Sequence, residues 1–232
     1  MSISRIPAAL VRAETSPRGS HLPAKLARAK RPATVQRILK AAEGIFAEQG
    51  LAGARIDAIA RAARVNKALL YYYFRSKEEL HRFALGMLLE EFRAQAGTAF
   101  ERSSIRDQLV GYVNGYFDFV VAHPNYPRLV QREVMGRGAE LSWIVREYFQ
   151  PLNRRLAATV RAGMAQGEIR RVDPEQTVLT LIAMTAFYFA AAPVLSELWG
   201  HDPLAPARIA ARREAVLDFL EHGLFLRRAR TR

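Results

Sequence analysis

The sequence contains no cysteine among its 232 residues. This absence excludes thiol catalysis, iron–sulfur clusters, thiolate zinc sites and disulfide bonds, and it fits the reducing cytoplasm, where we expect the protein to reside. The five histidines form no H-x-x-x-H pair or other metal-binding spacing. The motifs G-x-S-x-G, H-E-x-x-H and G-x-x-x-x-G-K-S/T are also missing. We therefore expect neither an enzyme nor a bound metal or cofactor.

Long hydrophobic runs are scarce as well. Arg5, Pro7 and Arg12 interrupt the N-terminal residues, so we expect no secretory signal. The one long uncharged stretch, residues 178–195, reaches only the lower edge of the length that spans a bilayer. Because it contains threonines, a tyrosine and a proline, it predicts a buried helix and no membrane partner.

Acidic residues are too few to balance the basic ones. Against 35 lysines and arginines there are 22 aspartates and glutamates, which leaves a net charge of +13 and favours a polyanionic partner. Residues 1–80 hold 15 basic and six acidic side chains, so most of the excess is N-terminal. Residues 1–30 combine six basic residues with three prolines and no helical period, which predicts a basic, disordered arm. This arm either contacts phosphates or only improves solubility.

Apolar spacing predicts helices at the start of the ordered chain. Between Val35 and Phe46 the apolar residues recur at i, i+3, i+4 and i+7, the pattern of an amphipathic helix, and Gly50 supplies a stop. Two short helical segments follow, over residues 56–63 and from Asn66, with about three residues between them. Two short helices this close together predict a helix-turn-helix.

The rest of the chain also has a helical pattern. Ser76 and Glu79 form a capping box that opens a long helix ending near Phe100. No stretch alternates with period 2, so we predict an all-α fold, with a helix-turn-helix domain over 31–78 and a larger helical domain over 79–232. The expected helices of the larger domain, after the long one, are 105–122, 126–136, 139–166 with a kink or break at Pro151, 174–198 and 205–228.

The second helix of the helix-turn-helix has an unusual outward face. If the turn lies at residues 63–65, Asn66 caps this helix, and Leu70 and Phe74 form its buried side. The opposite side then carries one lysine, one small residue and two tyrosines. A lysine can donate to guanine N7 and O6, a small residue permits close approach, and tyrosine hydroxyls can bond phosphates. The face therefore predicts docking in a major groove through Lys67, Ala68, Tyr71 and Tyr72, whereas Tyr73 either joins them or packs beneath neighbouring helices.

A longer segment around this helix resembles a known family. The stretches ILKAAEGIFAEQG and IDAIARAARVNKALLYYYFRSKEEL, within Ile38–Leu80, are similar to the DNA-binding domain of TetR (tetracycline-repressor-like) transcriptional regulators, and the ending YYYF-x-S-K-E-x-L is highly specific. The resemblance implies a homodimeric repressor with a three-helix head and a C-terminal ligand-binding and dimerisation domain. It implies base contacts for Lys67 and Ala68, base or phosphate contacts for Tyr71 and Tyr72, and phosphate contacts for Tyr73 and Lys77.

Two positions depart from the family pattern. Ala54-Arg55 stands where the family has a threonine or serine that caps the helix and binds a phosphate, so we expect no side-chain cap there, and Arg55 can supply the phosphate contact instead. Arg64 stands where the family has glycine in the turn. Either the turn is unstrained, or this arginine adopts a left-handed conformation at modest cost.

The larger domain resembles the family only in size and helix spacing. In such proteins the last two long helices form a four-helix dimer interface, for which segments 174–198 and 205–228 are the candidates here. Segment 174–198 is almost uncharged and needs burial on more than one side, which a second copy supplies. The partners implied are a double-stranded DNA operator, a second copy of the chain and a small-molecule effector. Candidate lining residues for an effector cavity, which are otherwise plain core, are Tyr112, Tyr116, Trp143, Phe149, Met164, Met184 and Phe187.

The chemistry of these candidates favours an apolar or aromatic effector. Arg132 or Arg146 would pair with a ligand carboxylate if its side chain faced inward. The alternative function is a ligand-independent, architectural DNA-binding protein with the same fold. A cavity of roughly 300 Å³ or more in the larger domain separates the two, because a pocket for a small molecule needs about that volume.

Overall fold

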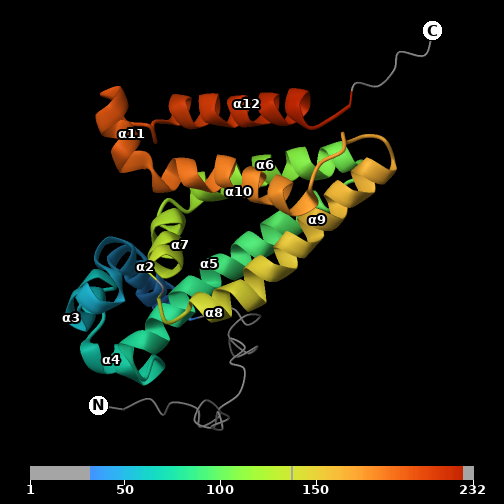
Figure 1. Ribbon diagram of the computed structural model, residues 1–232. Helices are drawn as coiled ribbons and strands as arrows, with labels where there is room; N and C mark the ends of the chain where they lie inside the picture. The colour runs from blue at the N-terminus through green and yellow to red at the C-terminus, as the bar shows by residue number, and fades with distance from the viewer. Residues whose placement is uncertain (1–31, 137, 227–232) are drawn as a thin grey trace. The chain divides into compact units, whose positions relative to one another are not determined.

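The computed structural model describes residues 32–136 and 138–226 (Figure 1). Regular structure in these residues is helical, apart from one isolated antiparallel bridge between Ile169 and Phe225. The prediction of an all-α fold is confirmed. The predicted basic arm over residues 1–30 lies outside the described residues.

Three helices form the N-terminal head: α2 (Ala33–Gly53), α3 (Ile56–Ala62) and α4 (Lys67–Tyr73). The predicted stop at Gly50 is a kink inside α2, where this glycine has a φ of 69°. The turn between α3 and α4 includes Arg64 with a φ of 55°, so the arginine adopts the left-handed conformation, which costs a non-glycine residue about 1–2 kcal/mol. The predicted helix-turn-helix is present.

Helix α5 (Lys77–Ala99) connects the head to the rest of the chain. Its N-cap residue Ser76 accepts a hydrogen bond from the Glu79 backbone N–H at 3.1 Å, as the predicted capping box requires. The reciprocal bond is displaced by one residue, because the Glu79 carboxylate accepts from the N–H of Arg75. α5 packs against α2 in the head and against α6 (Ile105–Ala122) beyond it.

The larger part of the chain, called the body here, continues with α7 (Tyr126–Met135), α8 (Leu141–Ile144) and α9 (Gln150–Ala165). A π-helical turn, η2 (Val145–Phe149), joins α8 to α9. Pro151 lies in the first turn of α9, where its missing N–H is tolerated, so the irregularity predicted near this proline precedes it as the π-helical turn.

The prediction of one helix over 174–198 is wrong. The chain forms α10 (Pro174–Ala190) and α11 (Ala192–Trp199), bent by 69° at the break. Pro193 follows the break directly, and it has no N–H with which to continue the hydrogen-bond ladder of α10. Within the described ranges no single helix is both long and apolar enough to cross a bilayer, and only this bent pair passes that test when taken together.

The last helix, α12 (Pro206–Gly223), ends five residues before the predicted boundary at 228. Beyond it the chain turns back to the segment after α9. The Arg170 N–H donates to the Leu224 carbonyl at 3.1 Å, and the Leu226 N–H donates to the Glu168 carbonyl at 2.8 Å. Extended pairing therefore replaces the last predicted turns of the helix.

One hydrophobic core extends through head and body. Phe46 and Leu70 in the head, Leu85 and Leu89 on α5, and Phe117 on α6 belong to a single cluster of buried side chains. The head is therefore packed against the body through shared buried side chains, and close-packed interiors of this kind transmit strain.

Candidate DNA-binding face and ligand cavity

Helix α4 exposes the face that its sequence predicts. The Asn66 side chain accepts a hydrogen bond from the Leu69 N–H at 2.7 Å and caps the helix. Leu70 is fully buried beneath it. Tyr71 and Tyr72 keep 44% and 47% of their surface exposed, which is unusual for large aromatic side chains that have no solvent-facing task. Lys67 and Ala68 are exposed on the same helix.

Two of the predicted contact residues already have partners within the head. The Lys67 ammonium lies 3.0 Å from a carboxylate oxygen of Asp57 on α3. This hydrogen bond raises the pKa of Lys67, so the side chain stays charged. Tyr73 is half-buried and meets the Tyr72 ring edge-on, with 5.1 Å between ring centroids. Tyr73 is thus partly packed against the core, which is the alternative to a DNA contact that the sequence left open.

The positions flanking α3 and α4 differ in their roles. Arg55 is exposed and precedes α3, and it makes no side-chain capping hydrogen bond, as predicted. The Lys77 ammonium donates to the carbonyls of Ala52 and Ala54 at 3.2 and 3.1 Å. It thus holds the end of α2 beside α5, and its contact with a phosphate stays a prediction.

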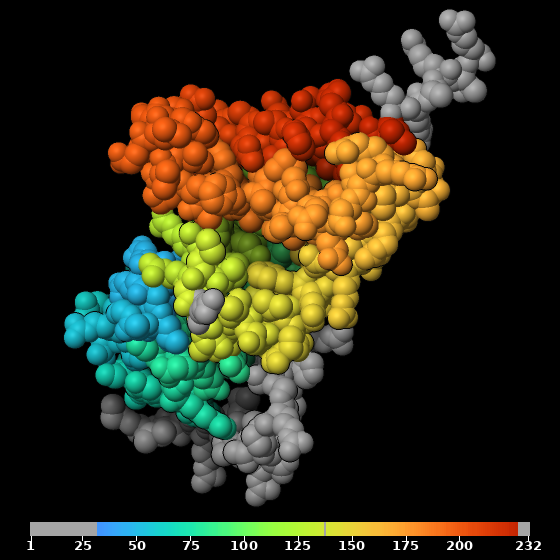
Figure 2. All heavy atoms as spheres, viewed as in Figure 1, coloured from blue at the N-terminus to red at the C-terminus, as the bar shows by residue number. Residues whose placement is uncertain are grey.

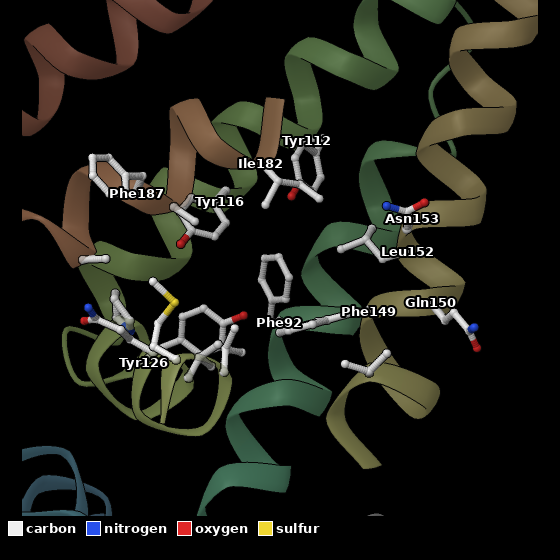
Figure 3. A pocket seen from close by; sticks show the side chains of 18 residues that line it. Phe92, Tyr112, Tyr116, Tyr126, Phe149, Gln150, Leu152, Asn153, Ile182 and Phe187 are labelled. Carbon is white, nitrogen blue, oxygen red and sulfur yellow. The ribbon is translucent and has the colours of Figure 1, made fainter. Parts of the chain in front are cut away.

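A cavity of about 520 Å³ lies in the body, among residues of α5, α6, α7, η2, α9 and α10 (Figure 3). Among the residues that the structure describes, no lysine, arginine, histidine, aspartate or glutamate lines it. The lining is aliphatic and aromatic, with two glutamines and an asparagine as further polar groups. Its aromatic side chains are Phe92, Tyr112, Tyr116, Tyr126, Phe149 and Phe187.

Three buried tyrosines add hydroxyl groups to the lining of this cavity. Burial raises the pKa of Tyr112, Tyr116 and Tyr126 above its ordinary value. Their hydroxyls are therefore neutral at physiological pH, and each can donate and accept a hydrogen bond. The cavity can recognise polar atoms of a ligand, but its described lining residues offer no charge to balance an ionised one.

Four of the seven predicted lining residues line the cavity, and the other three lie elsewhere. Trp143 packs edge-on against Tyr148 and beneath the Arg82 guanidinium. The Met164 sulfur accepts from a backbone N–H at 3.5 Å, outside the cavity. Met184 borders a separate hollow between α10 and α12.

Sequence reasoning missed Phe92 and Tyr126. Phe92 continues the apolar stripe of α5, and nothing in its spacing separates it from plain core. Tyr126 could have been found, because Tyr126, Val130 and Val134 follow one another at i, i+4 and i+8 on one face of α7, and all three line the cavity.

Helix α7 touches both the cavity and the head. Arg132 on this helix donates to the carbonyls of Ala47 and Glu48 at 3.0 and 2.6 Å, and so satisfies carbonyl groups of α2 just before the kink at Gly50. Asn125 donates to the Glu43 carboxylate at 3.1 Å. Arg132 therefore points to the head and not into the cavity.

The junction of head and body also contains a buried ionisable group. His81 on α5 is 2% exposed, and its Nε2 lies 3.5 Å from a carboxylate oxygen of Glu133 on α7. The ring meets Phe46 of α2 edge-on, with 4.8 Å between centroids. Burial lowers the pKa of His81, while the carboxylates of Glu133 and Glu140 oppose that shift.

Helices α10, α11 and α12 form a continuous outer layer of the body (orange to red in Figure 2). This layer leaves large apolar side chains in solvent, including Leu179 and Phe219, which are both 59% exposed, and Leu198, which is 72% exposed. Large exposed apolar side chains make this layer a candidate interaction surface.

Comparisons with known proteins agree with the sequence and the fold. Residues 38–82 match the model described as "Bacterial regulatory proteins, tetR family", and residues 106–220 match "Tetracyclin repressor-like, C-terminal domain". The HTH-type transcriptional repressor SCO4008 of Streptomyces coelicolor is 34% identical over 72% of this chain and 83% of its own length. The HTH-type transcriptional repressor NicS of Pseudomonas putida is 31% identical over 81% of this chain and 87% of its own.

A solved structure supports the fold. The transcriptional regulator FadR of Bacillus subtilis, in complex with stearoyl-CoA, superposes with a TM-score of 0.64 at 19% identity, over 80% of this chain and 96% of that one. The chain belongs to the tetR family of bacterial regulatory proteins. Its predicted function as a DNA-binding transcriptional repressor of this family is confirmed, and the family is one of regulators, not enzymes. In the described ranges no cluster of three or more histidine and acidic side chains could hold a metal ion.

Proposed function

We propose that this protein represses transcription as a homodimer and that a small molecule bound in the 520 Å³ cavity releases it from its operator. The observation that carries the proposal is the cavity itself. It exceeds the volume of roughly 300 Å³ that a small-molecule pocket needs, and a purely architectural DNA-binding protein needs no such space. The same cavity makes the architectural alternative the weaker one.

The DNA contacts in this proposal are divided between bases and backbone. Lys67 and Ala68 contact base edges in the major groove, because they stand on the exposed face at the start of α4. Side chains at the edges of that face contact phosphates. The proposed contacts with the DNA backbone come from Arg55, Asn66, Tyr71, Tyr72, Tyr73 and Lys77.

Dimerisation is proposed through α10, α11 and α12. Their exposed apolar side chains favour association, since burying them removes apolar surface from water. A symmetric dimer presents two copies of α4, and two such helices read half-sites about 34–36 Å apart. We therefore expect a palindromic operator.

The proposed effector is uncharged and apolar or aromatic. An ionised group would lose its hydration in this cavity without meeting an opposite charge, which is unfavourable. Polar atoms of the ligand can hydrogen-bond to the hydroxyls of Tyr112, Tyr116 and Tyr126, which burial keeps neutral.

The ligand signal is proposed to pass through α7. A ligand that contacts Tyr126 and Val130 pushes on a helix whose Arg132 is bonded to α2. A small shift of the heads then spoils their spacing on successive major grooves. A coupling free energy of about 1–3 kcal/mol would weaken operator binding roughly 5–150-fold.

The test begins with selection of bound duplexes from a random pool, followed by a screen for compounds that release the selected operator. We expect a palindrome and an uncharged releasing compound. Ala186→Trp should then fill the cavity and abolish binding of the releasing compound, measured by titration in the absence of DNA, because Ala186 lines the cavity. Ala94→Trp, at an exposed position on α5, is the matched control. Release that persists in Ala186→Trp would contradict the proposed ligand site.

A further inference from the structure

Asp57 places a negative charge on the helix-turn-helix surface, where it is unexpected because DNA is also negatively charged. Over residues 55–75 it is the only acidic side chain, beside five lysines and arginines. It lies in the first turn of α3 and its side chain is 64% exposed. Its carboxylate oxygen lies 3.0 Å from the ammonium of Lys67, the first residue of α4.

Two structural explanations account for only part of this arrangement. An acid in the first turn of a helix interacts favourably with the helix dipole, and α3 has no side-chain cap. That interaction does not require contact with a second helix. An exposed ion pair adds little to folding stability, so stability does not explain the contact either. On a surface for a polyanion, an acid that repels phosphates lowers affinity unless it serves another purpose.

The chemistry of lysine suggests that purpose. Its ammonium is a compact charge on a flexible stem, so a free lysine beside DNA readily reaches a phosphate, which carries no sequence information. The ammonium has three N–H donors. One donor bound to Asp57 leaves two for guanine N7 and O6, and the carboxylate cancels the net charge that would draw the side chain to the backbone.

We propose that Asp57 is a positioning residue that holds the Lys67 ammonium toward the floor of the major groove and away from phosphates, and so converts a general DNA contact into a base-selective one. The inference rests on the proposed base contact of Lys67. It adds that Asp57, which is not itself among the proposed DNA contacts, determines whether Lys67 contacts a base or a phosphate.

The test compares single and double variants on two duplexes, the operator selected from a random pool and a scrambled sequence of equal length. In Asp57→Asn, affinity for the scrambled duplex should rise about two- to fivefold, since an exposed pair of this kind holds its partners with that modest strength. The slope of log affinity against log salt should steepen by about 0.9, the value of one added phosphate contact. Discrimination at the base pair read by Lys67 should fall.

The Lys67→Met background separates positioning from simple repulsion. If Asp57 acts through Lys67, Asp57→Asn leaves discrimination unchanged in that background and raises affinity for the scrambled duplex by less than it does in the native chain. An equal rise in both backgrounds would overturn the proposal, because Asp57 would then act only as a negative charge. Unchanged discrimination in the single Asp57→Asn variant would overturn it as well.

Two controls keep the outcome interpretable. Glu78→Gln removes another acid from the first turn of a helix in the same region, and it should leave base discrimination unchanged. Asp57→Glu keeps the charge near α3 while moving the carboxylate, so it tests the geometry if Asp57→Asn folds poorly. If Lys67→Met itself keeps full discrimination, the base contact and the positioning role both fail. Selection of a palindromic operator and its release by a ligand would still stand.

Discussion

The face of α4 and the cavity of the body differ in almost every physical property. The face is exposed, basic and assembled from two short helices that are adjacent in sequence. The cavity is mostly apolar, has no charged side chain among its described lining residues and is assembled from helices between Phe92 and Ala190. Charge is thus concentrated where DNA binds and kept away from where the ligand is proposed to bind. The proposed coupling between the two sites therefore relies on packing and on the hydrogen bonds of α7.

The largest effect is expected from disrupting the proposed dimer, which brings two copies of the α4 face to one operator. Replacing Leu179 and Phe219 by glutamate places charges in the proposed dimer surface, so the chain should become monomeric and operator affinity should fall by up to about 10³-fold, toward the non-specific level. Sedimentation and operator titration measure both quantities. Ala94→Glu, at an exposed position on α5, is the control and should stay dimeric. A monomer with full operator affinity would contradict the paired-face model.

The second-largest effect is expected from a substitution on the exposed face of α4. Lys67→Ala should weaken operator binding by about 1–3 kcal/mol and leave non-specific binding nearly unchanged, because a base contact discriminates and a phosphate contact does not. Ligand affinity should not change. Titration on operator and scrambled duplexes measures this. Equal losses on both duplexes would reassign Lys67 to the backbone.

A third change targets the connection between the two regions. Arg132→Met removes the hydrogen bonds to Ala47 and Glu48 but keeps the length of the side chain. The coupling between ligand and operator should fall by about 0.5–2 kcal/mol, while ligand affinity in the absence of DNA stays the same. Arg128→Met, at an exposed arginine on the same helix, is the matched control. Unaltered coupling in Arg132→Met would exclude this route.

The smallest effect concerns the one buried histidine at the junction of the two regions. Because burial lowers the pKa of His81, the unfolded chain binds a proton at a higher pH than the folded one. The contribution of neutral His81 to the free energy of unfolding is therefore fully present above the unfolded pKa of about 6.5. As the pH falls below that value, the free energy of unfolding decreases by at most about 1.4 kcal/mol per pH unit. Urea unfolding between pH 7 and 5 should show this slope in the native chain and a smaller one in His81→Gln. Identical slopes would contradict the assignment to His81.

The head could be predicted from sequence almost residue by residue because its signals are local. Asn66 caps α4 through a contact three residues away, and Arg64 was already placed in the turn. The partners of Lys77 and Lys67 were not predictable in the same way. Their contacts with Ala52, Ala54 and Asp57 cross from one helix to another, and no periodicity specifies them.

The cavity was harder to predict because helical spacing defines a face only relative to the axis of its own helix. Trp143 precedes the π-helical turn η2, whereas Phe149 is the last residue of that turn, and only Phe149 reaches the cavity. The break between α10 and α11 was visible in principle, since Pro193 stands in the middle of the predicted helix. The role of Arg132 could not be foreseen, because its carbonyl partners lie 84 and 85 residues earlier in the chain.

The most direct test of the account is a linkage measurement on the wild-type dimer. Operator affinity is measured with and without saturating ligand, and ligand affinity is measured with and without saturating operator. If a ligand in the cavity and DNA on α4 favour different arrangements of one coupled structure, both affinities must change by the same factor, roughly 5–150-fold. Ligand binding that saturates normally on the operator complex, with no change in either affinity, would contradict the central claim.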